Sequence, residues 1–111
     1  MKILVVDDNG SIMRTIAEAL WKRDHEVMEH PDGVWMLENH PDQVDLVIVN
    51  LDLPEDRGLD VIKKVAEMEH PPQCFGVLGK KIDQKIPTNS SVVIVLKAQL
   101  LLELKERRII K

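Results

Sequence analysis

Short apolar runs alternate along this chain with stretches of helical periodicity. This alternation predicts a parallel β-sheet whose strands are joined by crossover helices. The run at Lys2–Val6 is almost continuously apolar, as expected for a strand that is buried on both faces of a sheet. We expect the strands at Lys2–Val6, Glu26–Glu29, Leu46–Val49, Cys74–Leu78 and Val92–Leu96.

Apolar residues at helical spacing fill most of the intervals between those runs. The interval before the last strand is the exception, because only the eleven residues Lys80–Ser90 separate Gly79 from Ser91. A crossover with its helix needs about 10–12 residues at least, so the fourth helix is expected to be shortened or lost. The other helices are expected over Ser11–Arg23, Val34–Asn39, Leu59–Met68 and Ala98–Ile110.

Composition narrows the class of protein. A chain of 111 residues suffices for one compact domain, which we expect to span residues 1–111. The net charge of −4 comes with no basic stripe and argues against direct binding of nucleic acid. No apolar run approaches the roughly 20 residues that span a bilayer, so no membrane contact is expected. The single cysteine, Cys74, permits no internal disulfide and suits a cytoplasmic protein.

Polar residues stand where two of the predicted strands end. Asp7 and Asp8 follow the first apolar run, and Asn50 follows the third. The carboxyl ends of parallel strands meet at one edge of the sheet, and functional crevices of such sheets lie at that edge. We therefore expect Asp7, Asp8 and Asn50 to lie close together.

These residues keep a fixed order with others farther along the chain: Asp7, Asp8, Asn50, Pro54, Gly58 and Lys97. A chain with this order resembles a response-regulator receiver (CheY-like) domain of two-component signalling. The resemblance covers nearly the whole chain and is weakest between Gly79 and Ser91. It implies a flavodoxin-like three-layer α/β sandwich with a five-stranded parallel sheet. It also implies no enzymatic activity, and protein partners such as an effector domain or another signalling protein.

Asn50 departs from the family at its central position. The resemblance places there the aspartate that accepts a phosphoryl group, which binds a divalent metal together with the acidic pair and the backbone carbonyl of Asp52. An amide in place of a carboxylate removes one negative charge, so Mg²⁺ binding by Asp8, Asn50 and Asp52 is expected to be weak or absent. The amide oxygen is a poor nucleophile because its lone pairs are delocalised. No acyl phosphate is therefore expected at residue 50.

Other positions that serve phosphorylation in the family are also changed. The hydroxyl-bearing residue after the fourth strand is replaced by Gly79, and the aromatic switch is replaced by Ile94. Lys97 is kept, but Ala98 follows it where the family has a proline. A cis bond before a residue other than proline costs about 3–4 kcal/mol, so a trans bond is expected there. These changes favour a pseudo-receiver that works without phosphorylation.

Such a pocket is expected to be closed without a ligand, with Lys97 paired to Asp7 or Asp8 and the Asn50 amide bound to neighbouring oxygen atoms. Three alternatives stay open. A phosphorelay receiver could retain Mg²⁺ and use Asp52 as a substitute acceptor. A small phosphatase-like enzyme could use Asp7, whose loop resembles the nucleophile loop of haloacid dehalogenase phosphatases. A small molecule could fill the space left beside Gly79.

The predicted last helix is apolar on more than one face. Leu102 and Ile109 lie seven residues apart, away from the positions that serve the core. An apolar surface of this kind on a small domain indicates a covered face, and we expect a homodimer through the last strand and helix. The alternative is that both side chains are single exposed apolar residues, which are common on monomers.

Overall fold

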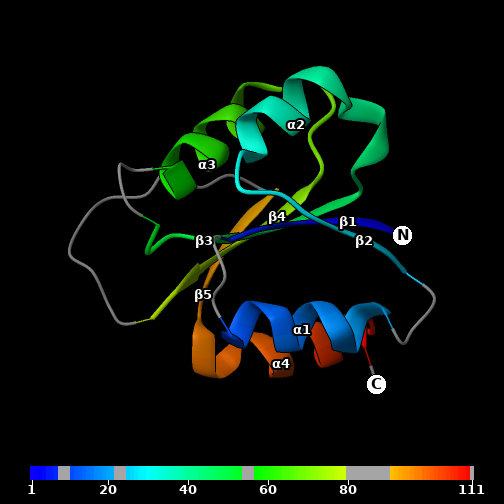
Figure 1. The fold of residues 1–111 in the computed structure, drawn as a ribbon, viewed down its shortest axis with the longest axis vertical. Coiled ribbons are helices and arrows are strands. Elements are labelled where there is room, and N and C mark those ends of the chain that lie inside the picture. Colours follow the sequence, from blue (N-terminus) through cyan, green and yellow to red (C-terminus); the bar gives the residue numbers. More distant parts are fainter. Residues whose placement is uncertain (8–10, 22–24, 54–56, 80–90, 111) are drawn as a thin grey trace.

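The computed structural model describes residues 1–7, 11–21, 25–53, 57–79 and 91–110. Their strands form one sheet in the order β2-β1-β3-β4-β5, and every neighbouring pair is parallel (Figure 1). The expected sheet is confirmed, and β3 and β4 are each one residue longer than the apolar pattern indicated. The strands are β1 (Lys2–Val6), β2 (Glu26–Glu29), β3 (Leu46–Asn50), β4 (Gln73–Leu78) and β5 (Val92–Leu96).

Helices cover both faces of this sheet. Figure 1 shows α2 and α3 on one face and α1 and α4 on the other, which gives the expected three-layer sandwich. Successive residues of a strand point to opposite faces, so each face has its own core. Ile3 and Val5 belong to the core that includes residues of α1 and α4, and Leu4 and Val6 to the core that includes residues of α2 and α3. The helices are α1 (Ser11–Trp21), α2 (Gly33–Asn39), α3 (Arg57–Glu67) and α4 (Lys97–Glu106), with a 3₁₀ turn at Pro41–Gln43.

The last helix differs from the expected range at both ends. It begins at Lys97, directly after β5, and ends at Glu106 rather than Ile110. Arg108 has a φ of 59°, which reverses the chain, and the amides of Arg108 and Ile109 donate to the carbonyls of Lys105 and Leu104 at 3.0 and 2.9 Å. This pattern is a Schellman-type helix end. A glycine usually occupies the left-handed position of such a helix end, but this chain has Arg108 there. Apolar periodicity alone therefore predicted a helix that extends beyond the turn.

Two other expectations concern residues that lie outside the described ranges. The shortened fourth helix falls on residues 80–90, and the end of the first predicted helix falls on residues 22–24, and both segments lie outside the described ranges. Within those ranges no helix is long and apolar enough to cross a membrane. Cys74 is buried in β4, and this burial raises the pKa of its thiol to about 12, so the thiol stays protonated in the folded protein.

Candidate functional site

The polar residues expected to meet do so at the carboxyl edge of the sheet. Asp7 follows β1, and Asn50 is the last residue of β3, the neighbour of β1. Asn50 is 6% exposed and is the one polar side chain that is buried among the described residues. Asp8 and Pro54 lie outside those residues.

Both ends of the Asn50 amide are hydrogen-bonded. Its Nδ2 donates to Asp7 Oδ1 at 3.0 Å, and its Oδ1 accepts from the backbone amide of Asp52 at 2.9 Å. The second bond closes an Asx turn, which starts the loop after β3. The opposite orientation of the amide would set its oxygen against a carboxylate oxygen, so the two bonds fix its direction. The expectation that this amide binds neighbouring oxygen atoms agrees with the first bond.

The described part of this arrangement presents no converging set of oxygen ligands, and Asp8, one of the expected metal ligands, lies outside the described residues. Mg²⁺ requires oxygen ligands that converge on one point. The Asn50 group nearest the Asp7 carboxylate is a nitrogen donor, while the Asn50 oxygen faces a backbone N–H. Among the described residues, no group of three or more histidine, cysteine or acidic side chains lies together in a way that could hold a metal ion.

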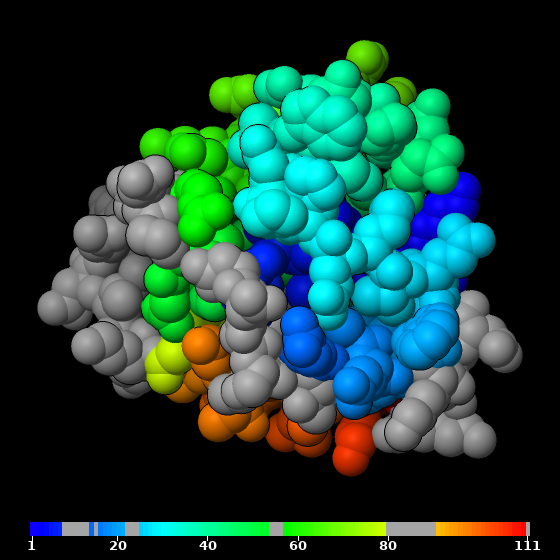
Figure 2. Space-filling view, in the orientation of Figure 1, coloured from blue at the N-terminus to red at the C-terminus, as the bar shows by residue number. Residues whose placement is uncertain are grey.

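Asp52 holds a second network beside the first. Its Oδ2 accepts from the backbone amide of Gly79 at 2.8 Å and lies 3.6 Å from Lys97 Nζ. Gly79 follows β4, and Lys97 is the first residue of α4. Figure 2 shows the yellow end of β4 against the orange segment that contains β5 and the start of α4. One carboxylate oxygen therefore links three segments that are distant in the sequence.

Two expectations about this edge need correction. Lys97 forms its ion pair with Asp52 and not with Asp7, which was one of its two expected partners. Asp8, the other expected partner, lies outside the described residues. The space beside Gly79 is also not empty, because a Cβ built on Gly79 would lie 2.7 Å from Asp52 Oδ2. Sequence reasoning treated Asp52 as a backbone ligand or a substitute acceptor. Two features of the sequence could have predicted this contact. One is an acidic residue two positions after Asn50, and the other is a glycine at position 79.

The structure describes both Ile94, which replaces the family's aromatic residue, and Ala98, which replaces its proline. Ile94 is half-buried in β5, where its Cδ1 would lie 2.8 Å from a Cβ built on Gly76. No cis peptide bond occurs among the described residues, so the bond between Lys97 and Ala98 is trans, as expected. With that bond trans, α4 begins at Lys97 itself.

The expected dimer face is wrong in one of its two residues. Ile109 is 6% exposed and packs in the core shared by α1 and α4, because the turn at Arg108 directs it inward. Leu102 is 58% exposed, and its neighbour Leu101 is 44% exposed. The exposed apolar residues of α4 are therefore Leu101 and Leu102.

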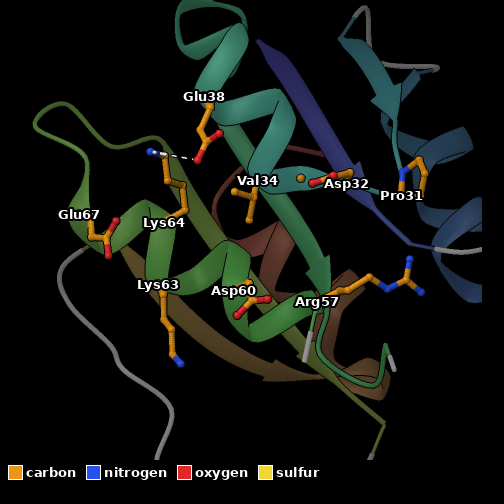
Figure 3. Close-up of a pocket in the computed structure, with 10 residues that line it drawn as sticks. Pro31, Asp32, Val34, Glu38, Arg57, Asp60, Lys63, Lys64 and Glu67 are labelled. Atoms are coloured by element: carbon orange, nitrogen blue, oxygen red, sulfur yellow. Dashed lines mark ion pairs between the residues drawn. The ribbon is translucent and has the colours of Figure 1, made fainter. Parts of the chain in front are cut away.

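A groove of about 580 Å³ lies between α2 and α3 (Figure 3). Glu38 and Lys64 point toward each other across it, and their charged atoms are 3.8 Å apart. Its charges are mixed, so the groove selects neither anions nor cations. Its charged lining residues are Asp32, Glu38, Arg57, Asp60, Lys63, Lys64 and Glu67.

Comparison with known proteins assigns the family. Residues 3–94 match the response regulator receiver domain, and the chain belongs to this family. It is 33% identical over 79 residues to the CAI-1 autoinducer sensor kinase/phosphatase CqsS of Vibrio cholerae, and 38% identical over 68 residues to a chemotaxis protein CheY homolog of Campylobacter jejuni. These matches cover 70% and 59% of the chain but only 12% and 52% of the two relatives.

Solved structures agree on the fold. A response regulator receiver domain protein from Bacillus halodurans superimposes with a TM-score of 0.71 at 20% identity, covering 95% of this chain and 90% of the other. A CheY-like receiver domain from Methylobacillus flagellatus gives a TM-score of 0.68 at 23% identity, with coverages of 94% and 95%. Receiver domains are signalling modules rather than typical enzymes. Family membership thus explains Asp7 as part of a receiver edge.

Proposed function

We propose that this receiver domain is a protein-interaction module of a signalling pathway and that its state is not set by phosphorylation at residue 50. The observation that carries the proposal is the buried Asn50 amide with both ends hydrogen-bonded. An amide cannot act as the phosphoryl acceptor. Its N–H group also offsets part of the Asp7 charge, a role that a bound cation otherwise serves. The Asn50 amide therefore has its hydrogen-bond partners without phosphate or metal.

Incubation with acetyl phosphate and Mg²⁺ tests this function. We expect the intact-mass spectrum of the wild-type chain to show no phosphorylated species, while the Asn50→Asp variant, which regains a carboxylate, serves as the comparison. A stoichiometric phosphorylated species of the wild type that persists in Asp52→Ala would overturn the proposal.

Phosphorylation at Asp52 is the second candidate function. It is favoured by the 38% exposure of the Asp52 side chain and by the 3.6 Å distance to Lys97, whose charge would offset that of a phosphoryl group. In the same mass experiment, this candidate requires a phosphorylated wild-type species that disappears in Asp52→Ala. Phosphorylation that persists in that variant would exclude it.

We also propose that the surface of β5 and α4 forms a homodimer. Among the described strands, β5 lies at the edge of the sheet and pairs only with β4, and Leu101 and Leu102 are exposed on the adjacent helix. Unpaired strand edges and exposed apolar residues are common features of interfaces.

Leu102→Asp is expected to weaken this dimer at least tenfold, because burying a leucine contributes about 1.5–3 kcal/mol. Sedimentation equilibrium over a range of concentrations measures the dissociation constant. Trp35→Asp is the matched control, since Trp35 is also exposed but lies on α2, on the opposite face of the sheet. A wild-type mass equal to that of the monomer at every concentration would contradict the dimer.

A further inference from the structure

The strand β2 has an outer side that no described strand covers. It lies at the edge of the sheet opposite to β5 and, among the described strands, pairs only with β1. The backbone amides of Glu26 and His30 donate to carbonyl groups on the β1 side at 3.0 Å each. Because the backbone groups of successive strand residues point alternately to the two sides, those of Val27 and Glu29 point away from β1. Such a row of outward groups is a template for a further strand.

A groove of about 410 Å³ lies beside this row, between α1 and β2. Val27 and Glu29 line it together, because alternate residues of a strand point to the same face of the sheet. Ala17 and Trp21 line it from α1, and Trp21 is 72% exposed, more than any other large apolar residue in the described ranges. Apolar surface next to outward backbone groups is the combination that binds added strands in other proteins.

The charges of β2 define the strand that it accepts. From Glu26 to Glu29 its side chains are acidic, apolar, apolar and acidic. Opposite charges on directly opposed strand residues stabilise the pairing, and like charges destabilise it. A complementary strand therefore carries basic, apolar, apolar and basic residues, an order that is the same in both directions. Glu18 adds a second carboxylate to the groove, where Arg14 is the one cation among the described lining residues.

A second copy of this chain does not fit this edge. Two β2 strands in full register would set glutamates opposite each other in either direction, which destabilises the pair. Charged residues on an edge strand commonly prevent such self-pairing. Residues 108–111, Arg-Ile-Ile-Lys, have the complementary order, but Ile109 and Ile110 are each 6% exposed and belong to the core. The complementary strand must therefore come from a different protein.

We propose that the outer edge of β2 is the docking site for an extended segment of a protein partner with the order basic, apolar, apolar, basic. The segment adds a strand to the sheet through the backbone groups of Val27 and Glu29. One of its apolar side chains enters the groove beside Trp21. This inference rests on the proposed function, since it names the segment that the partner of a protein-interaction module presents.

Amide NMR with a synthetic peptide tests the docking site. The probe is Thr-Lys-Val-Val-Lys-Thr, blocked at both ends, and its control has glutamate in place of lysine. We expect the lysine peptide to shift the Val27 and Glu29 amide signals saturably and to slow the exchange of these amides with solvent, because strand pairing engages both N–H groups. The glutamate peptide should bind at least about tenfold more weakly.

Two variants separate the backbone contribution from the charge contribution. Val27→Pro removes an outward N–H and leaves the bonds to β1, and should weaken binding of the lysine peptide about tenfold. Val27→Thr keeps both the N–H and the branched shape, and its affinity should stay within about twofold of the wild type. Glu26→Lys combined with Glu29→Lys should make the glutamate peptide the tighter ligand. This exchange of charge keeps the backbone intact, so it decides the question even if proline disturbs the strand.

The control for the charge exchange is Asp42→Lys. Asp42 is exposed in the 3₁₀ turn before β3, away from the groove, so both peptide affinities should stay unchanged. The inference is overturned if millimolar lysine peptide causes no saturable shift of the Val27 and Glu29 amides, or if the two peptides bind equally. Shifts of these amides that grow with protein concentration alone would show that a second copy is the occupant, and would also overturn it.

Failure of this inference is distinguishable from failure of the proposed function. The acetyl phosphate experiment reports on residue 50 at the carboxyl edge of the sheet, and the peptide titration reports on β2. Persistent phosphorylation would refute the function and leave peptide binding to its own result. Silent Val27 and Glu29 amides would refute the docking site, while the hydrogen bonds of Asn50 would still support the function.

Discussion

Asn50→Asp is expected to destabilise the metal-free domain by roughly 2–4 kcal/mol. The change is isosteric, so packing is preserved and the effect is electrostatic. The hydrogen bond from Asn50 Nδ2 to Asp7 Oδ1, now 3.0 Å long, becomes a contact between two carboxylate oxygens at a position that is 6% exposed. The bond from the Asp52 amide survives, because an aspartate oxygen can accept it equally well.

Mg²⁺ is expected to reverse this loss in the variant and to leave the wild type unchanged. A cation between two carboxylates removes their repulsion, and a ligand at about 100 times its dissociation constant stabilises the folded state by about 2.7 kcal/mol. Urea unfolding with EDTA and with Mg²⁺ gives the four free energies of unfolding that this comparison needs.

The control for this prediction is Asn39→Asp. It makes the same chemical change on the exposed end of α2, where the Asn39 side chain donates to the carbonyl of Trp35. A loss below about 1 kcal/mol that does not depend on Mg²⁺ is expected there. If Asn50→Asp is as stable as the wild type in EDTA, the Asn50–Asp7 hydrogen bond does not hold this edge together.

The fold was predictable because the buried strands of this protein appear in the sequence as continuous apolar runs. A parallel strand covered on both faces must be apolar throughout, and the runs at Lys2–Val6 and Leu46–Val49 mark such strands almost to the residue. Helix ends were less predictable. Arg108 adopts a left-handed conformation that glycine usually adopts, so the sequence carried no stop signal before Ile110.

The site was predictable where it depends on strand ends and unpredictable where it depends on side-chain contacts across loops. Chain order placed Asp7 and Asn50 together, since β1 and β3 are neighbours in the sheet. The partner of Lys97 depended instead on the path of the loop after β3 and on the missing side chain at Gly79. Those two features combine only in three dimensions, so the sequence did not point to Asp52 as a partner of Lys97.

Gly58→Ala is expected to destabilise the domain by about 1–3 kcal/mol, although alanine favours a helix interior by about 1 kcal/mol over glycine. Gly58 lies in the first turn of α3, where the helix packs against the end of β3. A Cβ there would overlap the carbonyl oxygen of Asn50 and lie 3.0 Å from the Cα of Leu51. Both atoms belong to the backbone, so either α3 or the Asn50 turn must move.

Comparison with Gly79→Ala separates this backbone contact from the general effect of an added methyl group. The Cβ at position 79 meets the movable carboxylate of Asp52, so its cost should stay well below that at position 58. Urea unfolding of both variants measures the difference, and the amide signals of Asn50 and Asp52 report whether the turn shifts. A Gly58→Ala variant as stable as the wild type would show that α3 moves away freely. The contact between α3 and the Asn50 backbone would then not be what positions the Asn50 amide toward Asp7.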